Sequence, residues 1–237
     1  VQLIKESKNT QPVQADTIMS LSPQVLLSKA MRDRCVANFK ELPNFGSSSP
    51  SNSLQYASVL IPMCVRHGKV HILYTLRSSN LKNHSGQVSF PGGKMDGDES
   101  IIDTALRETE EEIGVPRDAV DVWTIMPNFQ GLNKDLIITP VVGEIKKFDF
   151  DKLVRNTHEV EEIFTVPIET LCNTDTHGHI IYGKMPMPLY LFEKHKIWGI
   201  TGFITHMFLM HFLPSDLYSF NFDGPRYNVD DLRQSKL

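Results

Sequence analysis

The chain has 237 residues, of which 41% are hydrophobic and 22% charged, an ordinary composition for a soluble globular protein. This length suits one domain with extensions, or at most two domains. The formal net charge of −4 at pH 7 argues against a general nucleic-acid binder, which would carry a basic surface. The cysteines number three and lack paired metal-ligand spacing, so they fit a reducing compartment better than a disulfide scaffold.

The N-terminal part of the chain is predicted to be a helical extension. Apolar residues recur at helical spacing through residues 21–42, where Ser20 or Ser22 could cap the helix. Residues 43–53 are rich in Pro, Gly and Ser, which is typical of a linker. We therefore expect an extension and linker at residues 1–53, a folded domain at residues 54–213 and a polar tail at residues 214–237.

The pattern that follows predicts a mixed sheet between helices, and therefore an α/β fold. A helix is expected at residues 101–113, with Ser100 as its cap and Gly114 as its stop. Residues 197–213 are apolar but contain two histidines, so we expect a buried helix from about Thr201 and no membrane span. Strands are expected at residues 56–64, 69–77, 87–90, 122–126, 137–145, 164–166 and 189–192.

The end of the predicted central helix carries an unusual run of acidic residues. Three of these glutamates stand at positions i, i+3 and i+4, so they share one helix face. Like charges at i and i+4 destabilise a helix by roughly 0.2–0.5 kcal/mol, and the macrodipole disfavours negative charge at this end. An arrangement that a helix disfavours is expected at a functional site, where Mg²⁺ or Mn²⁺ compensates the repulsion. A solvated acidic face is the commoner explanation of a glutamate run taken alone. The glutamates on the shared face are Glu108, Glu111 and Glu112.

The residues around this run resemble the Nudix box. The spacing is Gly93, five residues, Glu99, seven residues, Arg107-Glu108, then Glu111-Glu112 and Gly114-Val115. Thr109 departs from the pattern, because the family usually has a bulky aliphatic residue there; its methyl group still permits packing.

The resemblance implies a fold and a set of functional residues. The expected fold is an α/β/α sandwich in which the box forms a loop–helix–loop. The expected metal ligands for Mg²⁺ or Mn²⁺ are Glu108, Glu111 and Glu112. Arg107 is expected to orient Glu108 or Glu111 through a charge-assisted hydrogen bond. Gly92 and Gly93 would let the backbone approach a metal or phosphate closely.

Residues 73–93 resemble a second signature, which marks coenzyme A diphosphatases within the Nudix family. Arg77 ends a predicted strand beside the box, where its guanidinium could bind a phosphate bidentately. His84 lies in a polar loop that suits ligand contact, although a lone histidine is more often structural. The expected substrate-binding residues are Arg77, His84, Gly86, Gly92 and Gly93. Tyr74 replaces a common leucine of this signature.

A general base outside the box is poorly marked in the sequence. Glu159 is the candidate, with Glu161, Glu162 and Glu144 as alternatives, and a solvated loop charge is the commoner role for any one of them. His177 and His179 lack further ligands at metal-binding spacing and are expected in a loop.

The last three residues, Ser235, Lys236 and Leu237, resemble the peroxisomal import signal. They imply a peroxisomal location, with an import receptor as a partner.

Together these patterns predict a metal-dependent hydrolase of the diphosphate bond in coenzyme A and acyl-CoA. The products would be 3′,5′-ADP and (acyl-)4′-phosphopantetheine, and the enzyme would control peroxisomal coenzyme A levels. One alternative is a Nudix diphosphatase acting on NADH or ADP-ribose, against which residues 73–93 argue. Another is a non-catalytic module that binds coenzyme A or a nucleotide, against which the intact acidic cluster argues.

Overall fold

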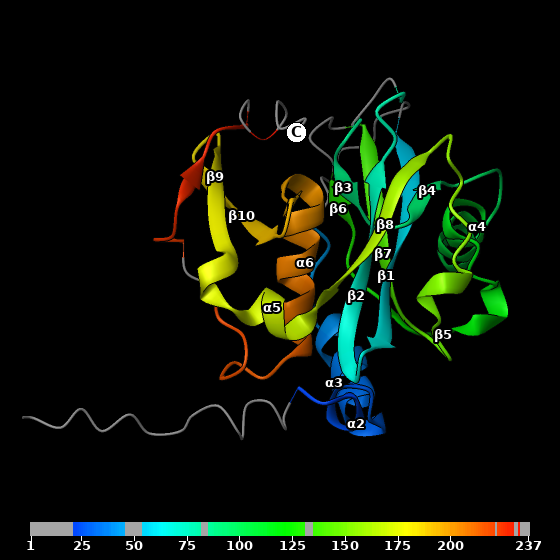
Figure 1. Cartoon of the computed structure of the whole chain (residues 1–237), viewed down its shortest axis with the longest axis horizontal. Helices are drawn as coiled ribbons and strands as arrows, with labels where there is room; N and C mark the ends of the chain where they lie inside the picture. The colour runs from blue at the N-terminus through cyan, green and yellow to red at the C-terminus, as the bar shows by residue number, and fades with distance from the viewer. Residues whose placement is uncertain are drawn as a thin grey trace, which may run out of the picture.

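The protein is layered, with one helix on each face of a mixed main sheet and a second sheet beyond. The computed structural model describes residues 21–45, 54–81, 85–130, 135–220, 222–229 and 232. Helix α4 (Ile101–Ile113) covers one face of the main sheet, and α6 (Gly199–Phe212) covers the other (Figure 1). The smaller sheet packs on the far side of α6. The predicted α/β/α sandwich is confirmed, and the outer sheet adds to it.

The main sheet is mixed because its long central strands run parallel while the other pairs are antiparallel. Strands β1 and β7 form the parallel pair, from Gln55↔Leu136 to Met63↔Glu144. The sheet order is β3-β2-β1-β7-β5, and β4 pairs with β1, β6 with β7 and β8 with β2. The strands are β1 (Gln55–Arg66), β2 (Lys69–Arg77), β3 (Val88–Ser89), β4 (Gly92–Lys94), β5 (Val120–Ile125), β6 (Phe129–Gln130), β7 (Leu136–Ile145) and β8 (Val160–Pro167).

Helix α4 has the predicted bounds, because both of its ends are fixed by local signals. The Ser100 hydroxyl accepts a hydrogen bond from the Asp103 amide at 3.1 Å, which caps the first turn. Gly114 ends the helix with φ 72°, a conformation that favours glycine. Thr109 is fully buried, and its hydroxyl donates to the Ala105 carbonyl at 2.6 Å. The threonine at the aliphatic position of the box therefore packs with its polar group satisfied.

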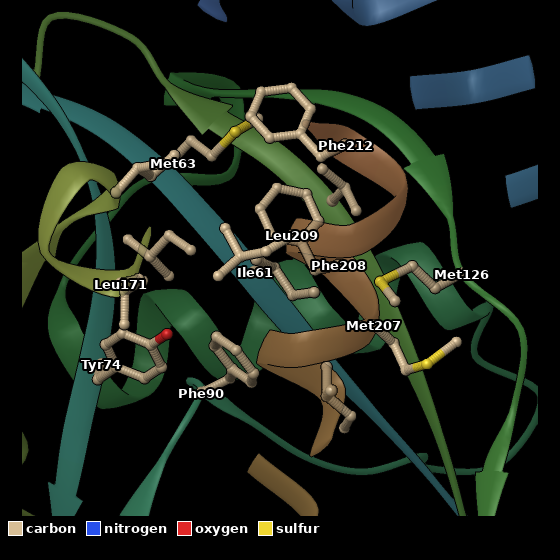
Figure 2. Packing of buried hydrophobic residues seen from close by; sticks show 14 of the residues in the cluster. Ile61, Met63, Tyr74, Phe90, Met126, Leu171, Met207, Phe208, Leu209 and Phe212 are labelled. Atoms are coloured by element: carbon tan, nitrogen blue, oxygen red, sulfur yellow. The ribbon is translucent and has the colours of Figure 1, made fainter. Parts of the chain in front are cut away.

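The apolar stretch at residues 197–213 forms α6, which is buried between the two sheets. Its Phe208, Leu209 and Phe212 point toward Ile61 and Met63 of β1 in the core (Figure 2). Burial on both sides explains an apolar sequence without a polar face. In the part of the chain that the structure describes, no helix is long and apolar enough to cross a membrane.

The second sheet includes strands that the sequence pattern did not predict. His177 and His179 lie in β9, not in a loop, because β9 pairs with β10 at Tyr190↔His177 and Pro188↔His179. The ring of His177 stacks on Phe220 with 4.4 Å between centroids, so this face of β9 is apolar. The sheet order is β11-β10-β9-β12, with β9 (His177–Tyr182), β10 (Met185–Phe192), β11 (His195–Ile197) and β12 (Arg226–Tyr227).

The predicted N-terminal helix is two helices that join the main core. Helix α2 (Pro23–Leu26) is separated from α3 (Lys29–Lys40) because Ser28 caps α3, its hydroxyl accepting from the Met31 amide at 3.2 Å. Phe39 is 3% exposed, and its ring lies 6.5 Å from that of Phe208. Residues 21–45 of the extension are therefore part of the folded body.

The segment expected to be a polar tail also packs against the protein in its described part. Tyr218 is buried, and its hydroxyl lies 2.6 Å from that of Tyr190.

The remaining short elements are α5 (Ile168–Cys172), η1 (Arg117–Ala119), η2 (Phe150–Lys152) and η3 (Thr174–Thr176).

Candidate active site

Three carboxylates converge beside β4, and they come from two separate segments of the chain. Glu108 and Glu112 lie one turn apart on α4, and Glu159 lies in the loop before β8. One oxygen of each lies within 4.8 Å of the others, which makes this the group of possible metal ligands found among the described residues. The structure thus brings Glu159, and not Glu111, together with Glu108 and Glu112. Carboxylate oxygens are the ligands that Mg²⁺ and Mn²⁺ prefer.

The paired glycines of β4 let the backbone touch these carboxylates. The Gly92 amide donates to Glu112 Oε2 at 3.3 Å. A Cβ atom at Gly93 would collide with the carboxylate of Glu108, and one at Gly92 would collide with the Ser58 carbonyl. Gly92 also has φ 153°, which favours glycine. Gly93 therefore lets β4 lie close to the acidic helix, and Gly92 lets β4 lie close to β1.

The carboxyl group of Glu112 lies in an environment that opposes its charge. Glu112 is only 2% exposed, and this burial raises its pKa to about 8. Arg77 opposes the shift, but its Nη1 lies 4.0 Å from Glu112 Oε1. Burial also raises the pKa of Glu108, against the effect of Arg107. A divalent cation fits this donor set, because it would supply the positive charge that the surrounding residues supply only in part.

Arg107 binds the acidic residues of the box together. Its Nη1 donates to Glu108 Oε1 at 2.9 Å and to Glu111 Oε2 at 3.2 Å. Its Nε and Nη2 each bond Glu99 at 3.0 Å, and Nη2 also bonds the Lys94 carbonyl at 3.2 Å. The hydrogen bonds from Arg107 lower the pKa of Glu99 to about 2. Arg107 therefore fixes the position of Glu108 and joins α4 to β4.

Among the expected substrate-binding residues, Arg77, Gly92 and Gly93 lie against this group, and Gly86 contacts the backbone of Arg77. Arg77 ends β2, and its backbone is held in a turn by the Gly86 amide, which donates to the Arg77 carbonyl at 3.0 Å. Gly86 has φ 67°, so the turn suits glycine. His84 lies outside the described residues.

The other candidates for a general base have other partners. Glu161 accepts from the Ser79 amide at 3.1 Å, and Glu162 accepts from Lys194 Nζ at 2.8 Å. Glu144 pairs with Lys146 at 2.5 Å. Of the four glutamates considered, only Glu159 reaches the site, and no local sequence signal distinguishes it because tertiary contacts place it there.

A pocket of about 620 Å³ lies at the other end of α4 and adds no carboxylate to the site. Its lining residues are Leu54, Gln55, Tyr56, Lys94, Met95, Gly97, Ile101, Asn128 and Thr139.

Proteins with related sequences include enzymes with named activities. The mitochondrial coenzyme A diphosphatase of Mus musculus is 38% identical over 165 residues, covering 67% of this chain and 78% of that protein. The human enzyme of the same name is 38% identical over 165 residues, covering 67% of this chain and 70% of that protein. Nudix hydrolase 3 of Caenorhabditis elegans is 35% identical over 195 residues, covering 74% of this chain and 80% of that protein.

The predicted peroxisomal location is contradicted by these comparisons. The mouse and human relatives are both named as mitochondrial enzymes. The prediction rested on Ser235, Lys236 and Leu237, which lie outside the described residues, and the expected import receptor rested on the same three residues.

The sequence also matches a family model over most of the main sheet and the acidic helix. The NUDIX domain matches residues 54–183, which is more than half of the chain. This range contains β1, β4 and α4, and it contains every carboxylate of the acidic group. The chain therefore belongs to the Nudix hydrolase family.

Proposed function

We propose that this protein hydrolyses the diphosphate bond of coenzyme A and acyl-CoA, yielding 3′,5′-ADP and (acyl-)4′-phosphopantetheine. The observation that carries the proposal is the group formed by Glu108, Glu112 and Glu159, with Arg77 beside it. The mouse and human relatives, both named as coenzyme A diphosphatases, support the choice of substrate. The match of residues 73–93 to the second signature supports it independently.

In this reaction the side chains of the site would have separate roles. Glu108, Glu112 and Glu159 would hold Mg²⁺ or Mn²⁺. Such an ion, when bound, neutralises phosphate charge and lowers the pKa of a water molecule. Arg107 keeps Glu108 in place through its 2.9 Å hydrogen bond. Glu111 accepts from the same guanidinium and is 56% exposed, so it remains available as a further carboxylate ligand.

Arg77 would hold the substrate against this centre. Its guanidinium is 28% exposed and lies 4.0 Å from Glu112, so a phosphate oxygen bound to it would lie close to the carboxylates. A guanidinium presents paired donors that match phosphate oxygens. In this proposal Glu159, first considered as a base, acts as a metal ligand.

A substrate panel with identification of the products tests the proposal. The full chain would be incubated with Mg²⁺ or Mn²⁺ and with coenzyme A, acetyl-CoA, NADH or ADP-ribose. We expect the highest kcat/KM with the coenzyme A compounds and release of 3′,5′-ADP. Equal rates on all substrates would favour a general nucleotide diphosphatase. Binding of coenzyme A without turnover would favour a binding module.

Replacing Arg77 tests how the substrate is chosen. We expect Arg77→Ala to lower kcat/KM for coenzyme A at least about tenfold, because a charge-assisted phosphate contact is lost. The preference for coenzyme A over ADP-ribose should shrink as well. Kinetics on both substrates measure this, with the remote Arg117→Ala as a control. An unchanged preference would remove Arg77 from the substrate site.

A further inference from the structure

We propose that Asn156 is a positioning residue of the metal site, which holds Glu159 in the group with Glu108 and Glu112. This inference rests on the proposed function, because it takes the three carboxylates to be metal ligands. Asn156 is not one of the three carboxylates of the group. It lies in a short strap, residues 154–159, whose first residues bond to the C-terminal end of α4 and whose last residue is Glu159.

The strap is attached to the helix that carries the other two carboxylates. The Val154 amide donates to the Ile113 carbonyl at 3.1 Å, and the Asn156 amide donates to the Glu112 carbonyl at 2.9 Å. Carbonyl groups in the last turn of a helix have no partner within the helix, so these bonds satisfy them. Asn156 is thus joined to the backbone of Glu112, whose side chain enters the site.

Asn156 then turns the chain back toward the carboxylates. Its Oδ1 accepts from the His158 amide at 3.1 Å, which forms an Asx turn. Its carbonyl accepts from the Glu159 amide at 3.1 Å and from the Val160 amide at 2.8 Å. One residue therefore connects to the helix and to the backbone of Glu159.

A second anchor holds the backbone of Glu159 beside the end of β2. The Glu159 carbonyl accepts from the Ser78 amide at 2.8 Å, and Ser78 directly follows Arg77. The strap also fits tightly against the helix end, because a Cβ atom at Gly114 would approach Val154 Cβ at 2.9 Å. The Asn156 side chain is therefore the part of this arrangement that a mutation can remove without changing a carboxylate.

The chain offers a matched control for such a mutation. Asn173 also forms an Asx turn, with its Oδ1 accepting from the Asp175 amide at 3.1 Å. That turn lies before η3 and belongs to neither the strap nor the acidic group. Asn156→Ala and Asn173→Ala delete the same group from the same kind of turn.

Calorimetric titration of the full chain with Mn²⁺ alone tests the inference without relying on activity. We expect Asn156→Ala to weaken Mn²⁺ binding about tenfold, since residues that orient metal ligands typically act at this scale. Asn173→Ala should change it less than about twofold, and Asn156→Ser, which keeps an oxygen acceptor, should restore most of the affinity. Thermal unfolding in EDTA would identify any variant that fails to fold, and Asn156→Gly, which also removes the oxygen acceptor but is readily accommodated in turns, would then replace Asn156→Ala.

A double mutant shows whether Asn156 acts through Glu159. We expect Glu159→Gln to weaken Mn²⁺ binding and Asn156→Ala to add little to that loss. Wild-type affinity in Asn156→Ala, an equal loss in Asn173→Ala or full additivity with Glu159→Gln would each overturn the inference. These outcomes are distinct from failure of the proposed function, in which the wild type itself would not bind Mn²⁺ or would not cleave coenzyme A.

Discussion

Glu112 shows why the acidic helix is costly to the protein without a cation. The side chain is 2% exposed, and its pKa lies at about 8 instead of the ordinary 4.5. Its nearest basic group, on Arg77, is 4.0 Å away. A carboxyl group whose pKa is raised this far by its surroundings is typical of functional sites.

The sign of the shift predicts how Glu112→Gln behaves. The folded-state pKa is raised, so the acid contributes most to stability below about pH 4.5, and this contribution is lost as pH rises through about 8. In EDTA, we expect Glu112→Gln to be more stable than wild type at about pH 9, by on the order of 1 kcal/mol or more. Activity with Mg²⁺ should fall at least about 100-fold.

Urea unfolding across this pH range, together with kinetics, measures both effects. Glu110→Gln is the control, because Glu110 lies on the same helix and pairs with Arg117 at 3.3 Å, away from the site. A glutamine variant that keeps full activity would remove Glu112 from the proposed machinery.

Helices and strands could be predicted from the sequence where the residues that define them are close together in the chain. Helix α4 was predicted to the residue, because the Ser100 cap and the left-handed Gly114 are adjacent to it. Strand β9 was missed, because it forms by pairing with β10 and because His177 is buried against Phe220, which is distant in sequence. Glu159 could be considered only as a base, because its place beside Glu108 comes from hydrogen bonds between the strap and α4.

Helix α6 and the segment after it are joined by a buried polar chain. His206 Nδ1 lies 2.8 Å from the Tyr218 hydroxyl, which lies 2.6 Å from that of Tyr190. Burial, with smaller effects of His177 and His211, lowers the pKa of His206 to about 4. The folded protein therefore keeps this imidazole neutral where an unfolded chain would protonate it.

This shift predicts a loss of stability in mild acid. The folded-state pKa is lowered, so the contribution of His206 is complete above about pH 6.5 and is lost as pH falls toward about 4. The variant His206→Asn can keep a polar atom near Tyr218 but has no imidazole to protonate. Between about pH 6.5 and about pH 4, we expect its free energy of unfolding to fall by on the order of 1–3 kcal/mol less than that of wild type. Urea unfolding at successive pH values measures it. Identical pH profiles for the two proteins would contradict the assignment.

At the scale of the whole molecule, composition predicted a linker at residues 43–53 but could not show how residues 21–45 pack. Residues 43–53 read as a boundary, yet α3 on one side of them and α6 near the other end of the chain share a core. Asn38 Nδ2 donates to the His211 carbonyl at 2.7 Å, and Arg32 Nη1 pairs with Asp121 at 2.8 Å. Such contacts join segments far apart in sequence, so no local pattern reports them.

The extension should therefore stabilise the whole fold, and Phe39→Ala tests this. Phe39 is 3% exposed, and its ring packs on the ring of Phe208 in α6. The ring of Phe208 also stacks on that of Phe212, with 5.0 Å between the ring centroids. Truncating a buried phenylalanine typically costs about 3–5 kcal/mol through lost burial and the cavity that remains. We expect urea unfolding to show a loss of this size, whereas Val25→Ala, at an exposed position, should change stability by less than about 0.5 kcal/mol. Because Phe39 contributes nothing to the acidic group, kcat of the folded Phe39→Ala protein should remain close to wild type. A stability loss no larger than that of Val25→Ala would mean that residues 21–45 are an independent appendage.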